Sequence, residues 1–251
     1  MIVKNTMPQI IKVTWSALLI VVLAGCAVRP PEKEANDPLE PMNRVIYKFN
    51  DVLDRAVLKP VSQGYQDYIP SPVRTGVRNF FFNIYEPITI VNNVLQGKPD
   101  QAAGDTMRLI FNTTFGVFGV FDVATGWGLE PHSEDFGQTF GVWGFGEGWY
   151  LVLPLLGPST ARDAAGLGLQ FFYDLDPMLH LITQDKPRYG AFALFFISER
   201  AELLSASEVL DTAAVDEYLQ VREAFRQQRW NDIHDGNPPE PDFFDQELFD
   251  E

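Results

Sequence analysis

The chain has almost no cysteine and few positive charges. Its single cysteine, Cys26, cannot form a disulfide within the chain of 251 residues or supply a multi-thiolate metal site. The 34 acidic residues outnumber the 19 basic ones, and the formal net charge is −15. Binding to nucleic acid requires several lysines or arginines that displace counterions from phosphates. We therefore expect no nucleic acid partner.

Long apolar runs and the common catalytic motifs are also missing. The run from Val13 to Leu23, interrupted by Thr14 and Ser16, is shorter than the about 20 apolar residues of a membrane span. Neither a GxSxG nucleophile elbow nor an HExxH zinc motif occurs. Strand-like alternation is scarce, whereas helical spacing continues to the end of the chain. These absences favour an all-α protein without catalytic residues, metal or cofactor.

One polar cluster follows Pro131 and could ligate a metal or move protons; it consists of His132, Ser133, Glu134 and Asp135. Its spacing matches no metal-ligand pattern. A solvated loop at the start of a helix explains it better, because acidic residues favour helix N-termini.

The N-terminus has the features of a secretory signal. Lys4 and Lys12 precede the short apolar run, and small residues follow it. The sequence Leu23-Ala24-Gly25-Cys26 resembles the lipobox of bacterial lipoproteins, in which the cysteine is acylated, by palmitate among other chains, and becomes the mature N-terminus. We predict a signal peptide at residues 1–25 and lipidation at Cys26; a buried cysteine at the end of an ordinary helix is the alternative. Ala27 and Val28, rather than aspartate, resemble an outer-membrane address.

The remaining sequence divides into a tether, one large domain and a tail. Residues 26–41 are rich in proline and predict an extended tether. Residues 42–234 are expected to form the helical domain, and the acidic residues 235–251 a disordered tail rather than a docking segment.

Helix boundaries follow from prolines and apolar spacing. An apolar stripe over residues 42–57 predicts a helix that buries this stripe and ends at Pro60. Further helices are expected over residues 71–82, 86–95, from about 100, from Ala161, from Pro187 and over 213–230. Thr160 is the expected cap of the helix at Ala161.

The middle of the chain is unusual for a water-soluble core. Ten of the 19 glycines lie between Gly104 and Gly148, interleaved with aromatic residues. The uncharged run from Leu109 to Phe121 would be roughly 20 Å long as a helix, too short for a hydrocarbon core of about 30 Å but long enough for one leaflet. A buried core helix is the alternative. Candidate contacts with membrane or acyl chains are Phe111, Phe115, Phe118, Trp143, Phe145 and Trp149.

Four stretches in the same order resemble one family, the MlaA (VacJ) lipoproteins of Gram-negative outer membranes. They are NDPLEPMNRVIYKFND at 36–51, RLIFNTTFGVFGVFDVAT at 108–125, EDFGQTFGVWGFGEGWYLVLPLLGPSTARD at 134–163 and YLQVREAF at 218–225.

The resemblance implies a single ring-like, all-helical domain in the inner leaflet of the outer membrane, with a central polar channel. It implies association with a trimeric porin and passage of mislocalised phospholipids to a periplasmic carrier, without catalysis. Phe49 and Asn50, in the first stretch, are expected to control the helix packing around the channel. Two alternatives stay open: a lipid-anchored periplasmic hydrolase such as an esterase, and a purely structural porin-associated lipoprotein.

Overall fold

The computed structural model describes residues 37–173, 175–182, 184–207 and 216–239, and these residues are mostly helical. In chain order the elements are α2 (Glu40–Leu53), the π-helix η1 (Asp54–Leu58), α3 (Lys59–Tyr68), α4 (Ser71–Leu95), α5 (Pro99–Thr114), α6 (Val123–Gly126), α7 (Phe136–Val142), β1 (Tyr150–Leu153), β2 (Gly157–Thr160), α8 (Ala161–Phe172), α9 (Pro177–Leu181), α10 (Asp185–Glu202) and α12 (Glu217–Ile233). The signal peptide, Cys26 and most of the predicted tail lie outside the described residues.

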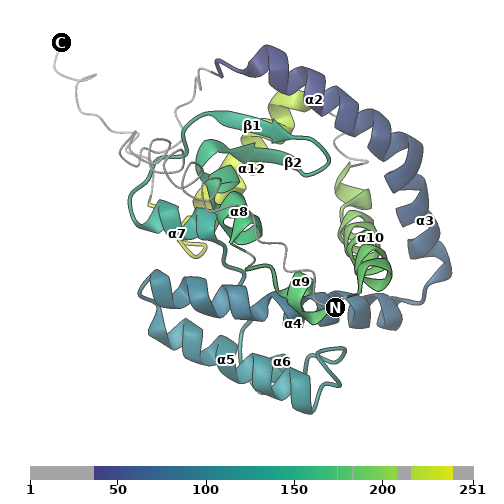
Figure 1. Ribbon diagram of the computed structural model, residues 1–251, viewed down its shortest axis with the longest axis vertical. Coiled ribbons are helices and arrows are strands. Elements are labelled where there is room, and N and C mark those ends of the chain that lie inside the picture. The colour runs from purple at the N-terminus through teal and green to yellow at the C-terminus, as the bar shows by residue number, and fades with distance from the viewer. Residues whose placement is uncertain (1–36, 174, 183, 208–215, 240–251) are drawn as a thin grey trace, which may run out of the picture.

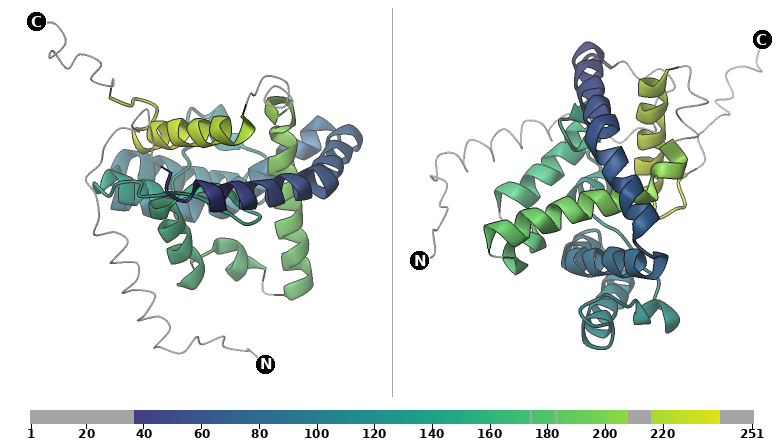
Figure 2. Two further views of the ribbon diagram at one scale, coloured as in Figure 1. Left: turned by 90° about the horizontal axis from the view of Figure 1, so that it is seen from above. Right: turned by 90° about the vertical axis from the view of Figure 1, so that its right-hand side faces the viewer.

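The elements follow a ring-like path, as expected (Figure 1). α2, η1 and α3 form one arc, α4 and α10 continue it, and α7, α8 and the β1–β2 hairpin complete it, while α5 and α6 lie outside α4. α12 covers one face of the ring, whereas α8 and α9 stand on the opposite face (Figure 2). The two strands are antiparallel, with Tyr150 opposite Thr160 and Leu153 opposite Gly157.

Polar side chains fill much of the interior. Among the largest side chains that are almost completely buried, Met178 alone is apolar; the others are Asn43, Asn92, Asn93, Thr139, Thr160, Asp105, Asp176 and Ser62. The buried apolar clusters are small: Phe81, Ile84 and Met178 join α4 to α9, and Tyr150, Val152 and Tyr218 join β1 to α12. Many large apolar side chains are instead exposed on the helices of the perimeter. Polarity is thus inverted relative to an ordinary water-soluble protein.

Two predicted helix ends are wrong because the helices continue past their prolines. The helix predicted to stop at Pro60 continues through η1 into α3, where Pro60 lies in the first turn. The segments predicted at 71–82 and 86–95 form the single helix α4, with Pro87 inside it at an exposed position. Of the expected helix over 213–230, the described part begins at Glu217.

The uncharged run from Leu109 to Phe121 is not one helix. α5 ends at Thr114, and the backbone then turns through left-handed φ values at Val117 (53°), Phe118 (56°) and Gly119 (88°). The turn is possible because Gly116 and Gly119 let the backbone approach its neighbours: a Cβ on Gly116 would lie 2.1 Å from the carbonyl oxygen of Phe121. The aromatic residues beyond α5 therefore do not share a helical face.

Other expectations hold. Thr160 caps α8, because its side chain accepts a hydrogen bond from the backbone N–H of Asp163. Strands are scarce among the described residues, and only the hairpin forms a sheet there. In the described ranges, every helix is too short or too polar to cross a bilayer.

Candidate functional site

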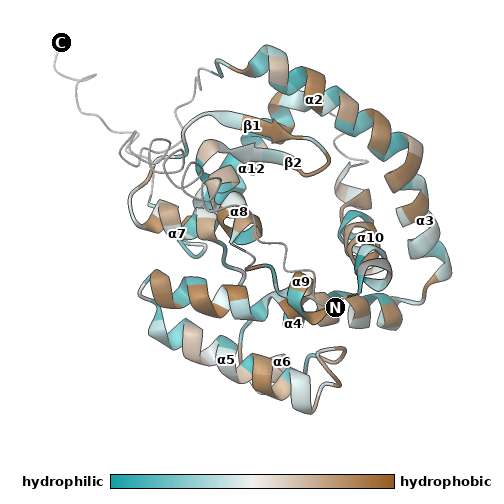
Figure 3. Ribbon diagram, in the orientation of Figure 1, coloured by the Kyte–Doolittle hydropathy of each residue, from teal (hydrophilic) through white to brown (hydrophobic). Residues whose placement is uncertain are grey.

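Helix α2 presents its apolar stripe outward. Met42, Val45, Phe49 and Val52 are 47% to 69% exposed, so the prediction that this stripe is buried is wrong. The reason is the opposite face of the helix, where amide side chains bond to the hairpin. Figure 3 shows apolar segments on α2 and α3 at the perimeter of the ring.

Asn43 and Asn50 attach α2 to the hairpin. The Asn43 amide donates to the carbonyl oxygen of Tyr150 at 2.9 Å and accepts from the N–H of Val152 at 3.0 Å. Asn50 repeats this pattern two turns later, donating to the carbonyl oxygen of Leu153 and accepting from the N–H of Leu155, both at 2.9 Å. Each amide thus pairs with β1 or its turn as a neighbouring strand would. The structure therefore places Asn50 at a helix–hairpin contact, while Phe49 faces outward.

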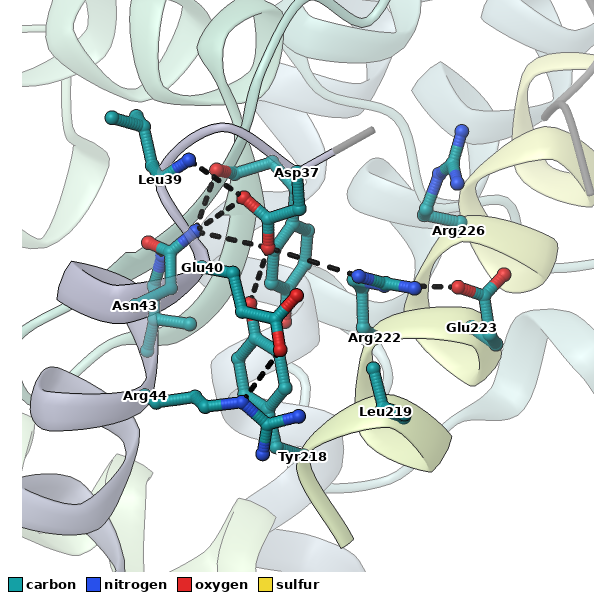
Figure 4. A network of polar contacts seen from close by, with 12 residues as sticks. Asp37, Leu39, Glu40, Asn43, Arg44, Tyr218, Leu219, Arg222, Glu223 and Arg226 are labelled. Carbon is teal, nitrogen blue, oxygen red and sulfur yellow. Dashed lines mark hydrogen bonds and ion pairs between the residues drawn. The ribbon is translucent and has the colours of Figure 1, made fainter. Parts of the chain in front are cut away.

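The start of the domain joins α2 to α12. Asp37 accepts hydrogen bonds from the N–H of Leu39, the amide of Asn43 and the hydroxyl of Tyr218 (Figure 4). Its carboxylate also lies 3.8 Å from the guanidinium of Arg222. The folded domain therefore begins by Asp37, and the predicted end of the tether at residue 41 is too late.

Three arginines on α12 reach carboxylates of different elements. Besides Arg222, Arg226 pairs with Glu147, which lies before β1. Arg229 pairs with Asp135 at 2.8 Å and with Asp163 at 2.9 Å, which belong to the starts of α7 and α8. Burial by itself would raise the pKa of Asp135, but Arg229 holds it below its usual value. α12 is thus held by charge as well as by the packing of Tyr218 against β1.

The polar cluster after Pro131 is occupied by structural contacts. His132 pairs with Asp105 at 2.9 Å, and Asp135 caps α7 by accepting from the N–H of Gln138. Glu134 is buried and accepts from Gln96 at 2.7 Å and Lys98 at 3.2 Å, so the expected solvated loop is wrong for this residue. Among the described residues, no three His, Cys, Asp or Glu side chains are grouped so that they could hold a metal.

The turn after α5 carries an exposed apolar surface, which we call the aromatic knob: Phe111, Phe115, Val117, Phe118, Phe121 and Trp127. Phe115 and Phe118 are 66% and 70% exposed, and Phe111 is half-buried against Trp127, with ring centroids 4.8 Å apart. Asn79 and Asn83 of α4 donate to the carbonyl oxygens of Val120 and Phe118.

Two of these side chains stand on a strained backbone. A left-handed φ is rare for a bulky residue and rarest for a β-branched one such as Val117. Such strain persists only where the surroundings enforce it, and it gathers at functional sites. The knob therefore has a fixed shape that keeps large apolar side chains exposed at the surface of the protein.

The remaining candidates lie around α7 and β1. Trp143 and Trp149 are 50% and 63% exposed, and the indole N–H of Trp143 donates to the carbonyl oxygen of Leu95 at 2.9 Å. Phe145 is half-buried against Phe140. The structure thus brings Trp143 and Trp149 to the surface but not all six candidates to one patch.

Sequence reasoning missed a buried charged cluster between α4 and α5. Arg108 lies 3.6 Å from Glu86 and 3.1 Å from Asp122, and it donates to Thr125 and to the carbonyl oxygen of Leu129. Burial raises the pKa of Glu86 to about 8, Asp105 adds to the rise, and Arg108 opposes it. The signal for this cluster in the sequence was Arg108, a charged residue that follows Met107 in an otherwise apolar stretch.

The comparisons with a family model and with individual proteins give the same family. Residues 35–232 match the family described as MlaA lipoprotein. The chain is 38% identical over 228 residues to the intermembrane phospholipid transport system lipoprotein MlaA of Escherichia coli (strain K12), covering 86% of this chain and 87% of that protein. The protein of the same name from Haemophilus influenzae is 33% identical over 235 residues, covering 90% and 92%.

A solved structure agrees with these relatives. It comes from work on the structural basis for maintenance of bacterial outer membrane lipid asymmetry, and the TM-score is 0.68 at 35% identity. The similarity covers 80% of this chain and 100% of that chain.

Replacing Asn43 tests the attachment of the hairpin. Asn43→Ala leaves the buried carbonyl of Tyr150 and N–H of Val152 without their side-chain partner, so we expect the free energy of unfolding in detergent to fall by about 1–3 kcal/mol. Gln220→Ala, at an exposed position on α12, is the control. Equal stability of both variants would contradict the role given to Asn43.

Stability should depend on pH through Glu86. Its folded pKa of about 8 exceeds the ordinary value of 4.5, so the folded state binds a proton more tightly than the unfolded state in this window. Stability is therefore greatest below the ordinary value and falls as pH rises toward the folded pKa.

Glu86→Gln should reduce the loss of stability with rising pH, measured as the melting temperature in detergent across this pH window. Glu130→Gln, at an exposed position, should keep it. An unchanged slope in Glu86→Gln would exclude Glu86 as its source.

Proposed function

Because the chain belongs to the MlaA lipoprotein family, we propose that it removes mislocalised phospholipids from the outer leaflet of the outer membrane and thereby maintains lipid asymmetry. It passes these lipids to a periplasmic carrier for transport back toward the inner membrane. The chain acts as a passive conduit and hydrolyses nothing.

The inverted polarity of the ring is the observation that carries this proposal. A phospholipid that changes leaflets must move its headgroup through hydrocarbon, and an uncompensated polar group there costs several kcal/mol. A ring with polar side chains inside and apolar ones outside lowers that cost, because the headgroup stays near polar groups while the tails stay in apolar surroundings. Asn43 on the inner face and Val45 on the outer face of α2 show the division within one helix.

The distribution of exposed residues supports a position in one leaflet. The outer stripe of α2 and the aromatic knob would contact acyl chains, and Trp143 and Trp149 suit the interface with headgroups. α12 exposes mainly polar side chains, so it would face the periplasm. We also propose a trimeric porin as a partner within the membrane, since the outer wall of such a barrel is apolar.

The hydrolase alternative has less support from the described polar cluster, because the contacts of its side chains join elements of the fold. His132, Glu134 and Asp135 are engaged with Asp105, Lys98 and Arg229 respectively. Release of fatty acid from phospholipid by the purified chain would revive that alternative.

An acidic residue in the aromatic knob tests the conduit. Phe118→Asp should leave the fold intact, because Phe118 is 70% exposed and aspartate tolerates a left-handed φ better than phenylalanine. We expect phospholipid to accumulate in the outer leaflet, measured by its accessibility to an added phospholipase. Gln227→Asp, on the exposed face of α12, should have no effect.

Copurification of the porin, measured in the same strains, distinguishes the conduit from a purely structural porin-associated lipoprotein. A purely structural lipoprotein would lose the porin in Phe118→Asp while lipid distribution stayed normal. Normal lipid distribution with folded, membrane-localised Phe118→Asp protein would contradict the conduit.

Lipid attachment has its own test. We expect labelled palmitate to enter the natural chain and not Cys26→Ala, because Cys26 offers the only thiol. Part of the Cys26→Ala protein should stay membrane-bound through the apolar perimeter. Palmitate incorporation into Cys26→Ala would place the acyl chains elsewhere.

A further inference from the structure

The exposed apolar stripe continues from α2 across η1 into α3. Its members are Met42, Val45, Phe49, Val52, Val57, Val61 and Tyr68, all 46% to 86% exposed. Neighbours on one face of an α-helix are three or four residues apart, whereas Val52 and Val57 are five apart. In a regular α-helix five residues turn the side chain by about 140° from the starting direction, away from the stripe.

The opposite face shows the same offset. Asp54 forms a bidentate pair with Arg200 of α10, at 2.8 Å and 2.9 Å, and the Ser62 hydroxyl donates to the carbonyl oxygen of Ile197, also on α10, at 3.2 Å. Asp54 and Ser62 are eight residues apart, which in a regular α-helix separates their directions by about 80°. Both nevertheless reach α10.

The π-helix accounts for both offsets. The backbone N–H of Lys59 donates to the carbonyl oxygen of Asp54, five residues earlier instead of four. This wider turn absorbs one additional residue, so the side chains after η1 regain the directions that they had in α2. Single π-turns inside α-helices frequently occur at functional sites.

We propose that η1 sets the rotational register of the arc, keeping one unbroken surface for phospholipid acyl chains on the outside while both helices keep their polar contacts inside. This inference rests on the proposed function for the identity of the acyl chains. Acyl chains fit the stripe because it contains no charged residue and its opposite face is occupied by the hairpin and α10.

Deleting the additional residue tests the register. In a chain that lacks Ala56, the arc can continue as a regular α-helix, and the residues of α3 keep their directions relative to α2. In a chain with one alanine inserted between Leu58 and Lys59, η1 does not absorb the added residue, so α3 rotates by about 100° and Val61 leaves the stripe. Cysteine reporters at Val45 and Val61, one on each side of η1, detect this rotation through their reaction with a water-soluble maleimide in outer-membrane vesicles.

In the natural chain and in the chain that lacks Ala56, both Val45→Cys and Val61→Cys should be protected by lipid. In the chain with the inserted alanine, Val45→Cys should stay protected and Val61→Cys should lose its protection. The chain without an added cysteine measures the background from Cys26. Reaction of Val61→Cys in the deletion chain, or its protection in the insertion chain, would overturn the register role.

Two controls keep the outcomes separate. Reaction of Val45→Cys in all of these chains would contradict the proposed membrane position and, with it, the acyl-chain occupant, whatever happens at Val61. If the insertion chain does not fold, a variant that carries the inserted alanine and also lacks Ala56 restores the residue count. It should restore folding and the protection of Val61→Cys, and failure to do so would overturn the proposal.

Discussion

A folded chain that lies in hydrocarbon must satisfy its polar groups internally, and on the proposed position in one leaflet this constraint would explain the arrangement of the ring. Apolar surroundings offer no water to an exposed amide or carboxylate, so such groups turn inward and pair. Asn43, Asn92 and Asp105 are fully buried, while Val45 and Phe115 are exposed, which is the arrangement that the proposed position requires. The interior is therefore held more by hydrogen bonds and ion pairs than by an apolar core.

The same constraint explains how distant segments are joined. The amides of Asn43 and Asn50 bond to the hairpin as a third strand would, and Arg200 of α10 binds Asp54 of the neighbouring η1. Arg229 connects the starts of α7 and α8 to α12. Each contact is directional, so it fixes the relative rotation of two elements as well as their proximity. A polar interior built this way can present groups to a headgroup without losing its shape.

The sequence predicted the class of fold and several helices, because caps and apolar spacing are local. Thr160 before Ala161 is an example, since its hydrogen bond involves a residue three positions away. The sequence could not predict which side of α2 faces outward. A helical stripe shows that two faces differ, but whether water, lipid or protein covers the apolar one depends on distant partners such as Tyr150 and Leu153. The stripe was therefore assigned to a core.

The aromatic candidates were partly predictable for a related reason. Phe115, Phe118 and Trp149 stand in glycine-rich stretches, which made them visible, yet the turn that exposes Phe118 depends on Asn83 in α4. The buried pair of Glu86 and Arg108 was missed because charged residues in helices are usually exposed, and only the packing of α5 on α4 buries them.

A structure of the acylated chain in a lipid nanodisc tests the central claim most directly. The account predicts acyl-chain density along Val45, Phe49 and Phe115 and none over α12. Acyl-chain density over α12, with these three side chains facing water or packed inside the protein, would contradict it.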